Sequence, residues 1–99
     1  MNTKILKLIK DKLDQQDLIF AQKTGIDNYL NGIYSDLILL AENNSNVQVT
    51  AHILLEKSPA FAQDSEEYLL QILYRLENRK RQFAEVIDIL HSGSTQDPN

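Results

Sequence analysis

The sequence predicts an all-α protein: an antiparallel four-helix bundle with a long C-terminal helix and a short flexible tail. Hydrophobic residues recur at helical spacing in four segments joined by short links. The chain has 99 residues, 42% of them hydrophobic, which is enough for one modest core. Only one segment alternates as a strand would, and a single strand leaves its edges unpaired. We therefore expect one helical domain over residues 1–91 and a tail over residues 92–99.

The first helical segment covers residues 3–23. Hydrophobic residues recur at helical spacing over its first half and less regularly at Ile19 and Phe20, while lysines and aspartates fill the other face. The polar run at residues 14–17 could divide this helix in two. Gly25 predicts its end, because glycine adopts the left-handed conformation that often closes a helix.

The second segment covers residues 27–42. Five hydrophobic residues lie alternately four and three positions apart and form a heptad seam: Ile26, Leu30, Ile33, Leu37 and Leu40. Asp27 is a suitable N-cap. Gly32 indicates a close approach by another backbone, since glycine otherwise costs a helix about 1 kcal/mol relative to alanine. A polar loop at residues 43–46 follows.

The third segment, residues 47–57, allows two interpretations. Its hydrophobic and polar residues alternate as in a strand, but the hydrophobic residues also fit one face of a helix. Because no second strand-like run is present to pair with it, we expect a short helix capped by Asn46 or Ser45.

The fourth segment, residues 65–91, is predicted as one long helix. Acidic residues occupy its first turn, where the helix dipole favours them, and Gly93 predicts its end. Such a helix would be roughly 40 Å long at 1.5 Å per residue, so its far end should overhang the bundle or curve around it. Residues seven apart mark its core-facing side: Leu69, Leu76, Phe83 and Leu90.

The composition excludes several kinds of chemistry. With no cysteine, the chain has no disulfide, no thiol nucleophile and no cysteine-bound zinc. Its net charge of −4 makes it a poor generic ligand for nucleic acid. It lacks the glycine-rich nucleotide-binding loops and the sequence context of an activated nucleophile or acid–base pair. We therefore expect no catalytic residue, no cofactor, no small-molecule substrate and no nucleic-acid partner.

The two histidines do not predict a metal site. His52 and Glu56 could share a metal, as could Asp88 and His91, but two ligands do not complete a site. We expect ordinary half-exposed histidines, with His91 suited to the negatively polarised end of the last helix.

The charges are unevenly distributed along the chain. Residues 1–23 hold five lysines and three aspartates, whereas residues 24–74 hold one lysine and seven acidic residues. Four bases gather in the middle of the last helix: Arg75, Arg79, Lys80 and Arg81. This basic cluster is either a solvated face with a Glu77–Arg81 pair, or a contact for an acidic protein surface or anionic lipid headgroups.

Two tyrosines beside this cluster are either core residues or exposed anchors for a partner. Tyr68 and Tyr74 lie one position off the hydrophobic seam of the last helix, and tyrosine is enriched at protein interfaces. The predicted partner-binding residues are therefore Tyr74, Arg75, Arg79, Lys80, Arg81 and His91.

In layout the chain resembles the immunity proteins of pediocin-like (class IIa) bacteriocins. These proteins have about the same length, four helices, a polar loop before a short third helix and a long fourth helix. The segment from Ser58 to Leu69 resembles their short helix, turn and acid-led last helix. The likeness covers most of the chain and is one of arrangement. Many of these proteins are basic, whereas this chain is acidic.

The resemblance implies a non-enzymatic, cytosolic four-helix bundle that protects its producer from a secreted pore-forming peptide. The implied partner is the mannose-type phosphotransferase permease together with the bacteriocin that uses it as receptor, with peripheral membrane contact as a further possibility. In that family the C-terminal half governs which bacteriocin is recognised, which corresponds here to residues 73–99. Protection would work by occlusion, with the helical surface holding the receptor–peptide complex closed.

Two other functions remain open on the sequence. A small helical adaptor or regulator, such as an antitoxin-like or kinase-inhibitor module, would use its exposed heptad seams to dimerise or to join another bundle. An all-helical enzyme of the chorismate-mutase type would need several cationic side chains in one pocket.

The chain shows no predicted targeting or membrane-spanning segment. Lysines interrupt the hydrophobic residues near its start, and no hydrophobic stretch approaches the roughly 20 residues that span a bilayer. The expected location is the cytoplasm.

Overall fold

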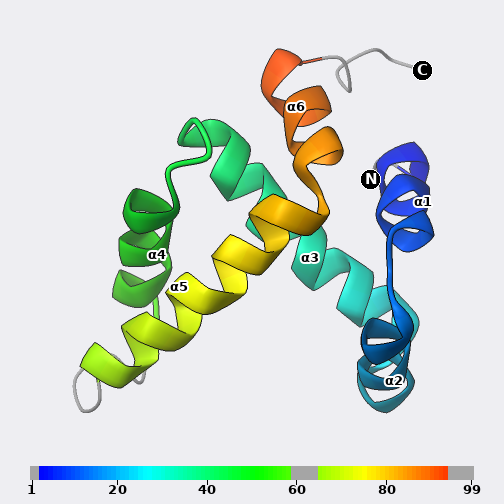
Figure 1. The fold of residues 1–99 in the computed structure, drawn as a ribbon, viewed down its shortest axis with the longest axis horizontal. Coiled ribbons are helices and arrows are strands. Elements are labelled where there is room, and N and C mark those ends of the chain that lie inside the picture. Colours follow the sequence, from blue (N-terminus) through cyan, green and yellow to red (C-terminus); the bar gives the residue numbers. More distant parts are fainter. Residues whose placement is uncertain (1–2, 59–64, 94–99) are drawn as a thin grey trace.

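The computed structural model describes residues 3–58 and 65–93 and confirms the all-α class. No strand occurs in these two ranges, and the predicted antiparallel four-helix bundle is not confirmed. Instead, α3 runs diagonally across the molecule and crosses α5 (Figure 1). The described helices are α1 (Thr3–Asp11), α2 (Gln15–Thr24), α3 (Ile26–Glu42), α4 (Val47–Glu56), α5 (Ser65–Gln82) and α6 (Ala84–Ser92).

The first predicted segment is two helices, α1 and α2, which confirms the alternative that the polar run raised. The side chain of Asp14 accepts the backbone N–H of Asp17 at 2.8 Å, and the Asp17 carboxylate accepts the N–H of Asp14 at 3.0 Å. This capping box satisfies two backbone donors that the start of a helix leaves unpaired. The break therefore has a local cause in the sequence.

Gly25 joins α2 to α3 with a φ of 88°, in the left-handed region that favours glycine. Its N–H donates to the carbonyl of Ala21 at 2.8 Å and closes α2. Helix α3 begins at Ile26, so Asp27 lies in its first turn and is not the N-cap. The expectation for Gly32 was wrong, because beyond its own helix no atom of the described residues lies within 4 Å of the place where a Cβ would be.

The third segment is helical, which settles the ambiguity between strand and helix. Asn46 is the N-cap of α4, and its side chain accepts the N–H of Val49 at 3.0 Å. The turn before it contains two residues with positive φ, Asn44 and Ser45.

The predicted single helix over residues 65–91 was wrong, because it breaks at Phe83 into α5 and α6. Phe83 has φ −118° and ψ 29°, and its ring is completely buried. The turn directs Val86 and Ile87 into the core beside it, where both are buried. The break therefore coincides with the burial of three hydrophobic side chains, and neither proline nor glycine is present at it.

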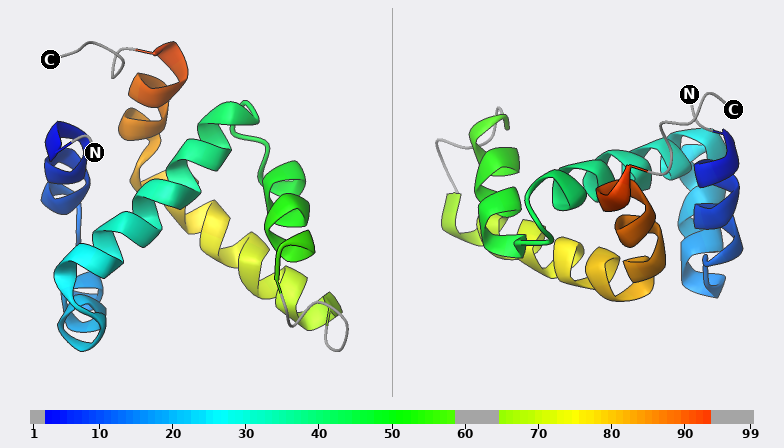
Figure 2. Two further views of the ribbon diagram at one scale, coloured as in Figure 1. Left: turned by 180° about the vertical axis from the view of Figure 1, so that it is seen from behind. Right: turned by 90° about the horizontal axis from the view of Figure 1, so that it is seen from above.

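The core lies where α3 meets α5, α6 and α1. Helix α4 packs along α5 on one side of the molecule, and α1 and α2 lie at the opposite end (Figures 1 and 2). The molecule extends 43 × 30 × 21 Å. Among the described residues, the completely buried hydrophobic side chains come from five helices and from Phe83 at the break: Ile9, Ile33, Leu37, Leu40, Ala51, Leu76, Phe83 and Val86.

Gly93 ends α6 in the left-handed conformation, with a φ of 77°, as predicted. Ser92 is still helical, so the predicted tail starts within α6, and residues 94–99 lie outside the described residues. Over the part of the chain that the structure describes, no helix has the length and apolar character to cross a bilayer.

Candidate functional site

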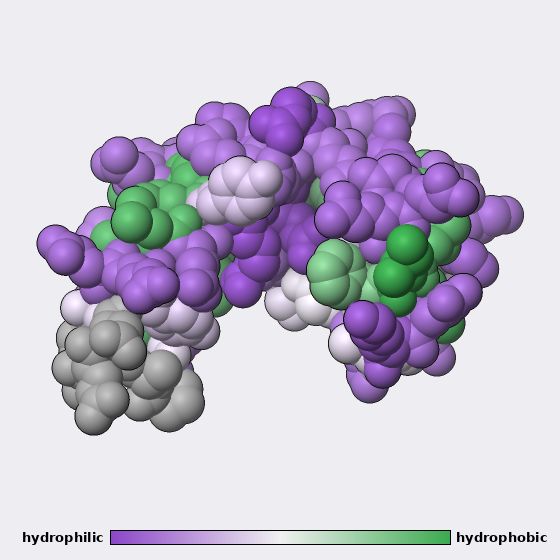
Figure 3. Space-filling view, turned by 60° about the horizontal axis from the view of Figure 1, so that its bottom comes forward, coloured by the Kyte–Doolittle hydropathy of each residue, from purple (hydrophilic) through white to green (hydrophobic). Residues whose placement is uncertain are grey.

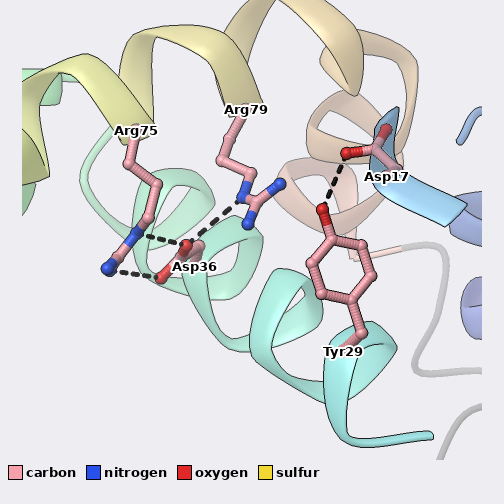
Figure 4. Close-up of polar contacts among 5 residues, drawn as sticks. All are labelled: Asp17, Tyr29, Asp36, Arg75 and Arg79. Carbon is pink, nitrogen blue, oxygen red and sulfur yellow. Dashed lines mark hydrogen bonds and ion pairs between the residues drawn. The ribbon is translucent and has the colours of Figure 1, made fainter. Parts of the chain in front are cut away.

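The predicted basic cluster is divided between two sides of α5. Arg75 and Arg79 point toward α3, where both bind the carboxylate of Asp36 (Figure 4). Arg75 donates from Nε at 3.0 Å and from Nη2 at 3.1 Å, and Arg79 donates from Nε at 3.4 Å. These two arginines therefore tie α5 to α3.

Asp36 is 6% exposed and occupies the core-facing side of α3, three residues after Ile33 and four before Leu40. A buried carboxylate needs a charged or hydrogen-bonding partner. Sequence reasoning missed Asp36, although a charged residue within a hydrophobic seam is a signal for a buried ion pair. The pairing with Arg75 spans 39 residues and cannot be read from local spacing.

A second polar cluster joins α2, α3 and the end of α5. The carboxylate of Asp17 accepts the hydroxyl of Tyr29 at 2.7 Å and the side-chain amide of Gln82 at 2.8 Å. The same Gln82 amide donates to the backbone carbonyl of Lys12 at 2.8 Å. The guanidinium of Arg79 lies 5.9 Å from the centre of the Tyr29 ring and connects this cluster to Asp36.

The cluster changes the acidity of two groups. Burial opposes the charged form of Asp17, but hydrogen bonds from Gln82, from the backbone of Asp14 and from Tyr29 outweigh it, so the pKa of Asp17 lies below 3.8. Burial, together with the hydrogen bond to Asp17, raises the pKa of Tyr29 above 10.0, although Arg79 opposes the rise. Asp17 therefore stays charged and Tyr29 neutral around pH 7.

A groove of about 420 Å³ lies between α3 and α5, and Arg75 and Arg79 line it together with Tyr29, Gly32 and Asp36. The chorismate-mutase interpretation needs cationic side chains that converge on a ligand. Here the two arginines converge on a carboxylate of the same chain, which already neutralises one of their charges.

The opposite side of α5 is exposed and carries large side chains. Leu70 is 65% exposed and Tyr74 is 72% exposed, and these residues share one helical face with Arg81. Arg81 donates to the side chain of Asn78, not to Glu77. We call Leu70, Tyr74 and Arg81 the α5 stripe. Sequence reasoning identified Tyr74 and Arg81 but missed Leu70.

The remaining predicted residues lie apart from this stripe. Lys80 is exposed, and Tyr68 packs against the core. His91 is exposed at the end of α6, where its Nε2 lies 3.0 Å from Oδ1 of Asn44 in the α3–α4 turn. Nδ1 of His52 contacts the carbonyl of Gln48 at 2.8 Å. Within residues 3–58 and 65–93, no group of three or more metal-binding side chains comes together.

Helix α2 also exposes large hydrophobic side chains. Leu18, Ile19 and Phe20 are 45%, 54% and 49% exposed, and Ile26 at the start of α3 is 37% exposed. Sequence reasoning placed Ile19 and Phe20 on the core stripe, which was wrong, because the buried residues of α2 are Asp17 and Ala21. Figure 3 shows hydrophobic surface on both sides of a hollow with a hydrophilic middle.

Compared with protein-family models, curated proteins and solved structures, the chain matches none of them.

Proposed function

We propose that this chain is a non-enzymatic helical protein that acts by binding another protein, and that it is an immunity protein against a pore-forming class IIa bacteriocin. The exposed α5 stripe carries the proposal. Tyrosine and arginine are enriched at the contact surfaces of proteins, and an exposed hydrophobic residue beside them adds surface that a partner can remove from water. Leu70 and Tyr74 meet this description, with Arg81 at the end of the stripe.

The position of the stripe agrees with the resemblance stated for the sequence. Tyr74 and Arg81 fall in the C-terminal half, to which the resemblance assigns recognition. The six helices follow the order of the four predicted segments, with the first and last segments each interrupted once. In this proposal the chain works from the cytosolic side and holds the complex of permease and bacteriocin closed.

The test is protection of living cells. A sensitive host that expresses the chain is challenged with a panel of class IIa bacteriocins, and we expect growth in the presence of at least one of them. The variant Tyr74→Gln should reduce that protection. Val49→Gln, which changes a 45% exposed hydrophobic residue on α4, is the matched control and should not. Protection from no member of the panel would contradict the proposal.

The exposed hydrophobic residues of α2 favour a second candidate, a helical adaptor or regulator that joins another bundle. Light scattering after size exclusion separates the two functions. A dimer whose mass does not change with concentration supports the adaptor, whereas a monomer that protects cells supports the immunity protein.

A further inference from the structure

Helix α2 has an unusual distribution of polarity. Its buried side carries the charged Asp17, held by Tyr29 and Gln82, and its outer side carries three consecutive hydrophobic residues. In most surface helices the polar residues face water and the hydrophobic ones face the core. The inner side of α2 is satisfied by hydrogen bonds, so its hydrophobic residues remain available for a contact outside the chain.

Helix α1 places lysines at the same end of the molecule. Ile5 and Ile9 are buried, and the exposed residues on the other sides of α1 include Lys4, Lys7 and Lys10. Lys23 is exposed at the end of α2. Figure 2 shows α1 and α2 together at one end of the molecule, away from α4. We call this surface the α1–α2 flank: Lys4, Lys7, Lys10, Leu18, Ile19, Phe20 and Lys23.

The charge of the flank differs in sign from that of the remaining chain. Residues 1–23 hold five lysines and three aspartates, a balance of +2, whereas residues 24–99 hold five basic and eleven acidic residues, a balance of −6. Of the eight charges in the first group, Lys12 binds Glu85 at 2.8 Å and Asp17 is buried, which leaves four exposed lysines against the exposed Asp11 and Asp14, a balance of +2. An anionic surface would therefore attract the flank and repel the rest of the molecule.

We propose that the α1–α2 flank binds the surface of an anionic lipid bilayer, with the lysines among the headgroups and Leu18, Ile19 and Phe20 entering the interface. Exposed leucine, isoleucine and phenylalanine beside lysines are the combination that peripheral helices use at anionic membranes. A second copy of the chain fits less well, because it would bring two positively charged flanks together. The proposal does not depend on the proposed function, since the purified chain tests it.

The experiment measures binding of the full chain to vesicles by flotation. Vesicles of phosphatidylcholine with one quarter phosphatidylglycerol are compared with vesicles of phosphatidylcholine alone. We expect binding to the anionic vesicles only, and a decrease when salt is raised from roughly 50 mM to roughly 500 mM. Ile19→Gln and the pair Lys7→Gln with Lys10→Gln should each lower the partition coefficient, by about tenfold for Ile19→Gln.

Two control variants test whether the effect belongs to this flank. Leu70→Gln changes a hydrophobic residue of α5 that is 65% exposed, which is similar to the 54% exposure of Ile19. Lys80→Gln removes an exposed positive charge from α5. Both should bind vesicles like the parent chain. Because Ile19 is largely exposed, Ile19→Gln should keep the thermal midpoint of the parent, which circular dichroism checks.

Three results would overturn the proposal. The first is equal or absent binding to both kinds of vesicle. The second is a loss of vesicle binding in the α5 control variants that equals the loss in the flank variants. The third is a dimer in solution that Ile19→Gln dissociates while vesicles do not bind, which would assign the flank to a second copy. If the chain binds anionic vesicles but does not protect cells from any bacteriocin, the result counts against the proposed function alone.

Discussion

The hydroxyl of Tyr29 in α3 donates a 2.7 Å hydrogen bond to the carboxylate of Asp17 in α2. Asp17 also accepts hydrogen bonds from Gln82 and from the backbone of Asp14, so three donors surround a mostly buried carboxylate. This arrangement needs the charged form of Asp17, because only the ionised carboxylate accepts at both oxygens without carrying a proton.

Asp17→Asn is expected to destabilise the protein by about 1–3 kcal/mol at pH 7, since a neutral amide oxygen accepts hydrogen bonds more weakly than a carboxylate and replaces two acceptor oxygens with one. The lowered pKa of Asp17 predicts how the effect changes with pH. As pH falls below 3.8, the unfolded chain takes up a proton before the folded chain does, so the stability that Asp17 provides is lost. Urea unfolding should show that the difference in unfolding free energy between parent and variant is smaller near pH 3 than at pH 7. The exposed change Asp11→Asn is the control and should stay close to the parent at pH 7.

Asp36→Asn should also destabilise the fold, because it removes the negative charge and one of the two acceptor oxygens that bind two guanidinium groups. Arg75 binds Asp36 through two hydrogen bonds of 3.0 and 3.1 Å but is 43% exposed, whereas Arg79 makes one contact of 3.4 Å and is 15% exposed, so both arginines contribute to the cost. We expect a loss of about 1–3 kcal/mol in the free energy of unfolding. Asp27→Asn, an exposed change on the same helix, should alter it by less than about 0.5 kcal/mol. Equal effects would show that Asp36 is not paired in solution.

Gly32→Ala is expected to stabilise the protein by about 0.5–1 kcal/mol. Gly32 lies inside α3 and is exposed, and outside its own helix an added Cβ would meet no atom of residues 3–58 and 65–93 within 4 Å. Alanine loses less conformational freedom than glycine when a helix forms. A thermal melt measures the change. Destabilisation would mean that another group approaches α3 at this point, as the sequence first indicated.

Asn46→Ala should cost about 1 kcal/mol, because it removes the side chain that caps α4. Gln48→Ala, two residues later and exposed, is the control and should have little effect. Chemical denaturation of both variants gives the comparison. If the two variants unfold alike, the Asn46 cap contributes nothing in solution.

The sequence predicted those parts of the fold that have local causes. Gly25, Asn46 and Gly93 act on their immediate neighbours, and the helix ends that they predict are present. The capping box of Asp14 and Asp17 is equally local, so the break between α1 and α2 was at least visible as an alternative.

The break at Phe83 and the pairing of Asp36 with Arg75 and Arg79 depend on contacts between distant residues. Nothing near Phe83 disfavours a helix, and the chain turns there because the turn buries Phe83 and the two hydrophobic residues of α6. For the candidate site, spacing along α5 found an exposed tyrosine and four bases. It could not show that two of those bases face α3, because that depends on how α3 crosses α5.

The inward side of α2 is held by hydrogen bonds, and this has a consequence for its orientation. Hydrophobic contacts tolerate rotation and sliding of a helix, whereas donors and acceptors must meet at fixed directions. Turning α2 by one residue would separate Asp17 from both Tyr29 and Gln82. The polar anchor thus sets a single rotational register, and every molecule in a population presents the same Leu-Ile-Phe triplet outward.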